Sequence, residues 1–251
     1  MARPLRVLVP GVPLHIIQRG HNRSQVFFGA DDAQRYLTWL TDLAALHGVA
    51  IHAYVLMTNH VHLLATPAAA DSLPKVLQRV GTRYAMYLND TRDRTGSLWE
   101  GRYRAAPVET ERYLLACSRY IELNPVRAGI AKHPREFRWS SYRHNTGEKT
   151  DSVITPHAAY RALGDDDAAR AAAYRALHEM ALADGVVQAI RNATNAGRAL
   201  GDEKFVARLG QALGRSLAPR QRGRPAKSQL VPGKTKSGST RPGKRSFGKK
   251  V

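Results

Sequence analysis

Hydrophobic residues in the first part of the chain fall into short runs that are typical of β-strands. Apolar and β-branched residues dominate residues 12–18, 50–57 and 60–66, and a tight connection around Thr58–Asn59 joins the last two runs. A further strand is expected within residues 98–108. The segments between these runs are long enough to hold helices.

Two of those segments carry apolar residues at helical spacing. The first stripe begins near Ala33 and stops at Gly48, and the second helix opens at Asp71–Ser72 with Pro74 in its first turn. The element order is therefore β-α-β-β-α-β, which predicts an α+β fold with a ferredoxin-like core. With both helices on one face of the sheet, we expect the other face to be open for a ligand.

Helical patterns continue beyond this core. One added helix begins near residue 111, and others are expected at Thr155–Pro156, over an alanine-rich segment that ends at Gly185, and before Gly214. We divide the chain into a first domain (1–148), which holds the ferredoxin-like core, a helical region (149–215) and a tail (216–251).

The tail differs from the rest of the chain in composition. The protein has 251 residues and a formal charge of +19, and residues 216–251 hold 11 of its 39 Lys and Arg but no Asp or Glu. Gly, Pro, Ser, Lys and Arg dominate this segment, so we expect it to be disordered when unbound. A polyanion is the partner that such a charge favours, and a membrane surface is a weaker alternative because few large apolar residues are available to insert.

Other bulk features restrict the class of protein. The single cysteine, Cys117, excludes an intrachain disulfide framework and agrees with a reducing compartment. The apolar N-terminus is broken by Pro10 and Pro13 and lacks a cleavage pattern, and no apolar run approaches a membrane span. We expect a soluble, cytoplasmic protein.

Two histidines with candidate chemistry lie on the expected third strand. In MTNHVHLL, His60 and His62 are separated only by Val61, so both imidazoles point from one face of the strand. Such a pair can begin a metal site. By itself it is more often an ordinary polar pair on a sheet or a pair of satisfied core residues.

The added helix supplies the candidate partners of these histidines. Tyr113, Cys117, Tyr120 and Asn124 lie along one of its faces, with Tyr120 and Asn124 one turn apart. If this face meets the histidines, three metal ligands and a phenol converge, and the phenolate could attack a phosphate. Alternatively, the stripe is core packing, Cys117 is a packed thiol, and Asn124 merely ends the helix before Pro125.

Several motifs together resemble a known family. VLMTNHVHLL (55–64) and RYIELNPVRAGI (119–130), with QRGHNRSQVF (18–27) and LWEGRYRA (98–105), are similar to those of the REP-associated tyrosine transposases. These are single-tyrosine HUH transposases of small bacterial insertion sequences. The resemblance covers about residues 10–145.

The resemblance implies an activity and a role for each residue of the site. It implies nicking and rejoining of single-stranded DNA at hairpin-forming repeats, through a covalent 5′-phosphotyrosine on Tyr120. His60, His62 and Asn124 match the metal ligands. Ligand chemistry alone leaves the metal open, and the family favours Mg²⁺ or Mn²⁺. It also implies a bacterial, nucleoid-associated protein that acts as a monomer or homodimer.

Candidate DNA contacts lie outside this constellation. Arg19, Asn22 and Arg23 form a polar loop after the first strand, and Arg102 lies beside two aromatic residues. Residues 104–106 read RAA where the family pattern has a lysine–serine pair, which weakens inferences about DNA contacts from this strand.

The tail contains one further candidate DNA contact. Arg222-Gly223-Arg224-Pro225 resembles an AT-hook, which places its arginines in the minor groove of A·T-rich DNA. The alternative is a solvated basic linker, because so short a motif is easily matched by chance in a segment rich in Arg and Gly.

Three functions compete at this point. The first is a tyrosine-dependent DNA strand transferase. The second is a non-catalytic DNA- or RNA-binding protein, and the third is a metal-dependent nuclease that uses water. Formation of a covalent protein–DNA adduct separates the first from the others.

Overall fold

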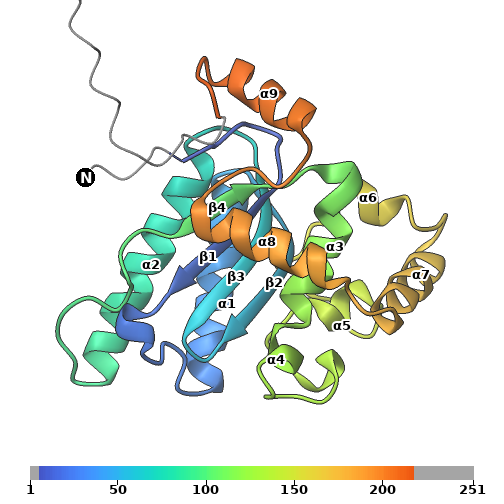
Figure 1. Ribbon diagram of the computed structural model, residues 1–251. Helices are drawn as coiled ribbons and strands as arrows, with labels where there is room; N and C mark the ends of the chain where they lie inside the picture. The colour runs from blue at the N-terminus through green and yellow to red at the C-terminus, as the bar shows by residue number, and fades with distance from the viewer. Residues whose placement is uncertain (1–5, 218–251) are drawn as a thin grey trace, which may run out of the picture. The chain divides into compact units, whose positions relative to one another are not determined.

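The central element of the fold is a four-stranded antiparallel sheet. The computed structural model describes residues 6–217. Its strands are β1 (Leu14–Arg19), β2 (Val49–Met57), β3 (His60–Pro67) and β4 (Arg104–Pro107), in the order β2-β3-β1-β4 (Figure 1). This order is that of a ferredoxin-like sheet, so the predicted α+β core is confirmed.

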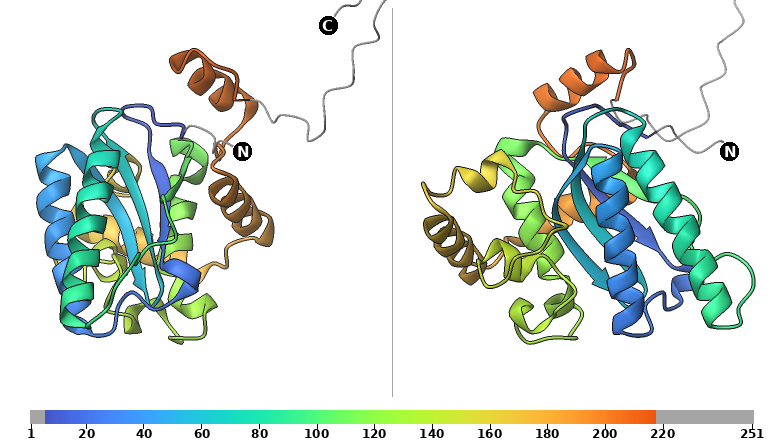
Figure 2. Two further views of the ribbon diagram at one scale, coloured as in Figure 1. Left: turned by 90° about the vertical axis from the view of Figure 1, so that its left-hand side faces the viewer. Right: turned by 180° about the vertical axis from the view of Figure 1, so that it is seen from behind.

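One face of the sheet is covered by the two predicted helices. α1 (Ala30–Leu46) and α2 (Ser72–Thr91) lie side by side on this face (Figure 2). Aromatic rings fill the layer between helices and sheet, and Tyr36 and Tyr84 pack edge to face with their ring centroids 5.2 Å apart. The Tyr84 hydroxyl donates to the carbonyl oxygen of Val26 at 2.6 Å, which satisfies a polar group inside this apolar layer.

The opposite face of the sheet is also covered, and the prediction of an open face is wrong. α3 (Thr110–Glu122) packs on β2 and β3, while α8 (Asp184–Ala196) packs on β4 and β1. These two helices lie on the side of the sheet away from α1 and α2 (Figure 2). Burial of apolar side chains drives this packing. The shared layer includes Val55, Leu64 and Ala106 of the sheet, Cys117 and Ile121 of α3, and Ile190 of α8.

The helical region after the core has more elements than predicted. α6 (Ala158–Arg161) and α9 (Glu203–Ala212) occur where helices were expected. The alanine-rich helix, α7 (Asp167–Glu179), ends six residues before the predicted end at Gly185, because the backbone of Met180 is extended (φ −87°, ψ 131°). A separate helix, α8, follows after three further residues.

The remaining elements are short. They are the 3₁₀ turns η1 (His21–Arg23) and η2 (Pro134–Glu136) and the helices α4 (Asn124–Arg127) and α5 (Tyr142–Asn145). All described residues belong to one compact unit. The predicted disordered tail falls almost wholly outside the described residues, and the boundary at 148/149 stays a prediction. Among residues 6–217, no helix is long and apolar enough to span a membrane.

A buried carboxylate fixes the end of α3. Glu122 is 0% exposed, and its Oε1 accepts hydrogen bonds from Ser141 Oγ at 2.6 Å and Asn145 Nδ2 at 2.8 Å. Its Oε2 accepts one from the Tyr174 hydroxyl at 2.8 Å, and His178 Nε2 lies 3.2 Å away. Because these donors come from α5, α7 and the turn before α5, the carboxylate ties α3 to the helical region.

Loss of this carboxylate should destabilise the whole unit. Glu122→Ala leaves buried donors without an acceptor, so we expect a loss of roughly 3–5 kcal/mol in the free energy of unfolding. Urea denaturation followed by circular dichroism measures it. Glu122→Gln keeps one acceptor oxygen and should lose less. The matched control is Glu179→Ala, an exposed position, where the change should stay within about 0.5 kcal/mol. Equal losses in the two alanine variants would contradict the role of Glu122.

A second buried polar group makes stability depend on pH. His52 is 7% exposed, its Nδ1 donates to the carbonyl oxygen of Thr155 at 2.7 Å, and its Nε2 accepts from Thr66 Oγ1 at 2.8 Å. Burial lowers the pKa of His52 to about 4. The folded protein therefore holds His52 neutral between about pH 6.5 and pH 4, whereas the unfolded chain binds a proton there.

The contribution of neutral His52 should thus be present above pH 6.5 and be lost as the pH falls toward 4. The expected slope is about 1.4 kcal/mol per pH unit from this group. Urea denaturation at a series of pH values should show a shallower decline for His52→Gln than for the parent protein, because the amide does not titrate. Parallel declines would show that His52 is not responsible.

Candidate active site

The two histidines of β3 point toward the α3 side of the sheet. His62 is 3% exposed and its ring centroid lies 5.0 Å from that of the half-buried His60. Val61, between them, packs in the opposite layer with the residues of α1 and α2. The alternation predicted from the sequence therefore holds.

Neighbouring groups orient the His60 ring. Asn59 Nδ2 donates to the carbonyl oxygen of Arg23 at 3.0 Å, so its Oδ1 is free to accept from His60 Nδ1 at 2.6 Å. His60 thus carries its proton on Nδ1 and has a lone pair on Nε2. Burial lowers the pKa of His60 to about 4 and that of His62 well below its usual value, so both rings are neutral at pH 7. A neutral imidazole is the form that binds a metal.

The tyrosine of α3 lies against this pair. Tyr120 is 5% exposed, and its ring centroid lies 6.0 Å from that of His62, with the rings at 75°. The guanidinium carbon of Arg127 lies 4.2 Å from the Tyr120 ring centroid. Arg127 also donates to the Tyr120 carbonyl oxygen. The Tyr120 phenol, the Arg127 guanidinium and two neutral imidazoles thus lie close together. From the sequence alone, the meeting of the tyrosine with the histidines was only a condition of the hypothesis.

Asn124 lies just beyond the helix on which it was predicted. α3 ends at Glu122, and Asn124 begins α4. Pro125 has no N–H to offer the carbonyl of Ile121, and Asn124 Nδ2 donates to that oxygen and to the Tyr120 carbonyl, both at 3.1 Å. α3 thus ends two residues before Asn124, and the Asn124 side chain caps two of its last carbonyls. This cap also commits its amide hydrogens and leaves Oδ1 as a free acceptor.

The donor set fits a divalent cation. His60 Nε2 and Asn124 Oδ1 each retain a lone pair, and His62 Nε2 is not used in a described hydrogen bond. No group of three or more His, Cys, Asp and Glu side chains within residues 6–217 has the arrangement of a metal site. The proposed ligands, two imidazoles and an amide oxygen, are not such a group because one of them is an asparagine. Hard and borderline metal ions bind ligands of these types.

Sequence reasoning missed several residues of the site. His15 of β1 is 1% exposed, and its Nε2 lies 2.8 Å from His62 Nδ1, while its ring is also 5.7 Å from Tyr120. Burial and the nearby Arg127 lower the pKa of His15 to about 3. A lone polar residue inside an apolar strand was the available signal. Arg127 carried none, because its place over Tyr120 depends on the turn at Pro125. Cys117 is a fully buried thiol, and burial raises its pKa, so it is the packed residue that was expected.

Comparison with solved structures supports the fold. One match is a REP-associated tyrosine transposase bound to a REP hairpin, with a TM-score of 0.51 and 17% sequence identity over 63% of this chain and 96% of that one. A candidate transposase from Deinococcus radiodurans R1 matches with a TM-score of 0.34 and 22% identity, over 48% of this chain and 96% of that one. A comparison with curated proteins finds no match.

The family comparison agrees with the fold comparison. Residues 9–124 match the family model described as Transposase IS200 like. This part of the chain, somewhat less than half of it, is therefore similar to the IS200-like transposases. The match ends at Asn124, so it includes every candidate catalytic and metal-binding residue. The similarity supports an enzyme of the transposase class.

Two of the predicted DNA-binding residues line the same cavity. Arg19 and Arg102 lie on the wall of a cavity of about 350 Å³. Its lining also includes Arg6, Tyr103, Arg104 and the end of α8 at Asn195–Gly197. Arg19 pairs with His60 in the register of β1 and β3, so this basic cavity adjoins the histidine pair.

The other predicted DNA contacts are not brought into that cavity. Asn22 and Arg23 are exposed in η1 and have positive φ (51° and 59°). Their turn is tied to the site through the Asn59–Arg23 hydrogen bond. Arg222 and Arg224 lie outside the described residues.

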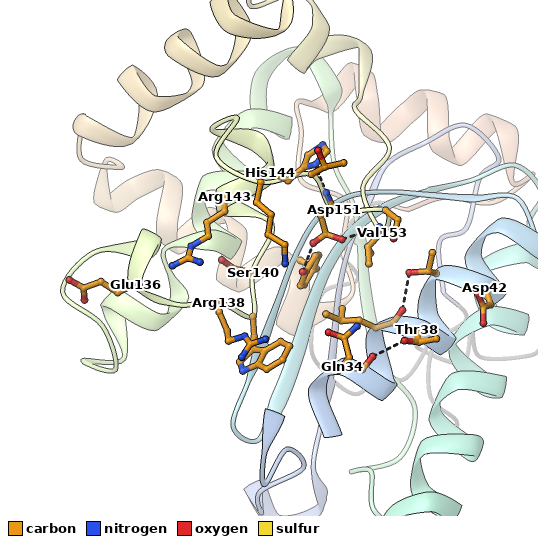
Figure 3. Close-up of a pocket in the computed structure, with 17 residues that line it drawn as sticks. Gln34, Thr38, Asp42, Glu136, Arg138, Ser140, Arg143, His144, Asp151 and Val153 are labelled. Carbon is orange, nitrogen blue, oxygen red and sulfur yellow. Dashed lines mark hydrogen bonds between the residues drawn. The ribbon is translucent and has the colours of Figure 1, made fainter. Parts of the chain in front are cut away.

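A separate cavity of about 700 Å³ lies away from this chemistry. Gln34 and Thr38 of α1 face Arg138, Ser140 and Asp151 across it (Figure 3). None of the site histidines, nor Tyr120, is among its lining residues. It is therefore not part of the candidate active site.

Proposed function

We propose that this protein nicks and rejoins single-stranded DNA through a covalent bond between Tyr120 and a 5′-phosphate, with the help of a divalent cation. The observation that carries the proposal is the packing of Tyr120 against His62 with Arg127 over its ring. Neither a non-catalytic DNA-binding protein nor a nuclease that uses water needs a phenol at this position.

The reaction exchanges one phosphodiester bond for another. The Tyr120 oxygen attacks phosphorus as the phenol loses its proton, and the P–O3′ bond breaks. The departing 3′-oxygen takes up a proton and becomes a free 3′-hydroxyl. In the reverse direction a 3′-hydroxyl attacks the phosphotyrosine, which rejoins the strand and restores the phenol. No water enters the balance, so the bond energy is kept for rejoining.

Arg127 is the residue of this chain that assists the phenol. A cation on the face of an aromatic ring is attracted to it, and the attraction grows as negative charge develops on the ring oxygen. Helix α3 supports the geometry, because Glu122 fixes its end two residues beyond Tyr120. Tyr120 is therefore held in place before substrate binds.

His60, His62 and Asn124 are the residues that would hold Mg²⁺ or Mn²⁺. When bound, such an ion withdraws charge from a phosphate oxygen and makes phosphorus more electrophilic. Tyr120 lies against His62, and His62 against His60, within one chain. The nucleophile and two proposed ligands thus come from a single copy, which supports action as a monomer.

The DNA substrate follows from the basic cavity and from the solved relative. Arg6, Arg19, Arg102 and Arg104 around one cavity suit a phosphate backbone. The relative with the same fold is bound to a REP hairpin. We propose hairpin-forming repeats of a bacterial nucleoid as the substrate. Arg222 and Arg224 would add contacts in an A·T-rich minor groove.

The decisive test is the formation of a covalent adduct. Full-length protein incubated with a labelled single-stranded hairpin and Mg²⁺ should give a protein–DNA species that survives denaturing electrophoresis. Tyr120→Phe should abolish it, because the phenyl ring packs alike but has no nucleophile. Chelation by EDTA should also abolish it, and Mn²⁺ should restore it.

Tyr113→Phe is the matched control, since Tyr113 lies about two turns before Tyr120 on the same helix, and it should retain the adduct. Cleavage without an adduct in both the parent and Tyr120→Phe would favour a nuclease that uses water. Binding without cleavage would favour a non-catalytic binding protein. Either result overturns the proposal.

The basic cavity should set the salt dependence of DNA binding. Each arginine that neutralises one phosphate releases counterions, so Arg102→Gln should lower the slope of log affinity against log salt by about 0.7. Fluorescence anisotropy with a labelled single strand between 50 and 300 mM salt, roughly the range over which such contacts weaken, measures this slope. Arg161→Gln, an exposed arginine of α6 outside the cavity, should leave it unchanged. The same slope for the two variants would exclude the cavity as the binding path.

A further inference from the structure

His15 is a buried polar residue to which the proposed reaction gives no task. Its ring lies between two partners, with Nε2 2.8 Å from His62 Nδ1 and Nδ1 2.7 Å from Thr194 Oγ1. The rings of His15 and His62 are stacked, with an interplanar angle of 14°. Thr194 comes from α8, and it is 1% exposed. These three side chains form a buried hydrogen-bonded row from the helical region to the proposed metal site.

The contact of Thr194 with Ile190 determines in which direction the hydrogen bonds of the row are donated. Thr194 Oγ1 lies 2.9 Å from the carbonyl oxygen of Ile190, which can only accept. With the threonine hydrogen placed there, Oγ1 accepts from His15 Nδ1. A neutral imidazole carries one ring proton, so His15 Nε2 accepts in turn from His62 Nδ1. The opposite direction leaves the Ile190 contact without a hydrogen and makes one bond fewer.

This direction determines which atom of His62 is free. With its proton on Nδ1, His62 has its lone pair on Nε2, as His60 has through Asn59. In the opposite direction His62 Nε2 carries the proton and has no lone pair for a ligand bond. His15 is 1% exposed, and its two ring nitrogens contact a hydroxyl and an imidazole, so the row offers no carboxylate to balance a charged ring.

We propose that Thr194 and His15 are positioning residues, which hold His62 with its proton on Nδ1 so that Nε2 is presented to a divalent cation. This inference rests on the proposed function in one respect, namely that His62 is a metal ligand. It gives α8, which lies outside the family match at residues 9–124, a role in the active site. Partners of this kind are known to fix the tautomer of metal-binding histidines and to change metal affinity 10- to 100-fold, to order of magnitude.

The direct test reads the tautomer in the full-length protein without metal or DNA. Nitrogen-15 labelling of histidine and a long-range proton–nitrogen correlation spectrum distinguish a protonated Nδ1 from a protonated Nε2, and His62→Asn assigns the signals. The parent protein should show His62 protonated on Nδ1. A parent protein with His62 protonated on Nε2 would overturn the proposal, whatever the outcome of the adduct assay.

Two variants of Thr194 separate this role from packing. Thr194→Val keeps nearly the same shape but removes the acceptor for His15, so we expect a mixed tautomer signal for His62 and an approximately 10-fold weaker affinity for Mn²⁺ in calorimetry. Thr194→Ser keeps the hydroxyl and should restore both the tautomer and the affinity. A folded Thr194→Val protein with unchanged tautomer and Mn²⁺ affinity would sink the proposal. Loss of Mn²⁺ binding in the parent protein would instead reject the metal site of the proposed function.

Discussion

The buried carboxylate of Glu122 is the constraint on which the arrangement of the molecule depends. A charge with no exposure to solvent is stable only when several donors surround it. Here the donors come from Ser141, Asn145 and Tyr174, on segments that follow α3 in the chain. The helix that carries Tyr120 is thereby held between the sheet on one side and the helical region on the other. Its position does not depend on apolar packing alone, which would tolerate sliding.

A helix held in this way fixes the position of the candidate nucleophile. Tyr120 is packed against His62, and the turn at Pro125 brings Arg127 back over the phenol ring. Asn124 turns its amide hydrogens to the carbonyls left open at the end of α3. The end of α3 at Pro125 thus positions both the Arg127 guanidinium and Asn124, the candidate amide ligand. Tyr120 and Asn124 both lie within the residues that match the IS200-like transposase model, which is why we interpret this arrangement as a candidate active site.

Much of the core could be predicted from the sequence because its signals are local. Alternating and helical spacing identified the strands and the helices α1, α2 and α3, and His60 and His62 had to share a face of their strand. The open sheet face was wrong for an equally physical reason. The alanine-rich helix was predicted to end at Gly185, and no helix was expected over the residues that follow it, where α8 lies. Because α8 was not predicted, its packing over β1 and β4 was not predicted either.

The sequence by itself determined which residue types were available and which of them shared a strand or a helix face, because backbone geometry repeats with a fixed period. Only the tertiary structure decided which groups complete one another. Thr194 and His15 are 179 residues apart, and no periodicity links them. Their contact exists because burial of the apolar face of α8 brings it onto β1 and β4, and a buried polar group must then find a partner nearby. The shared face of His60 and His62 could be predicted from the sequence. The contacts that His62 makes through His15 with Thr194 are set by the tertiary structure.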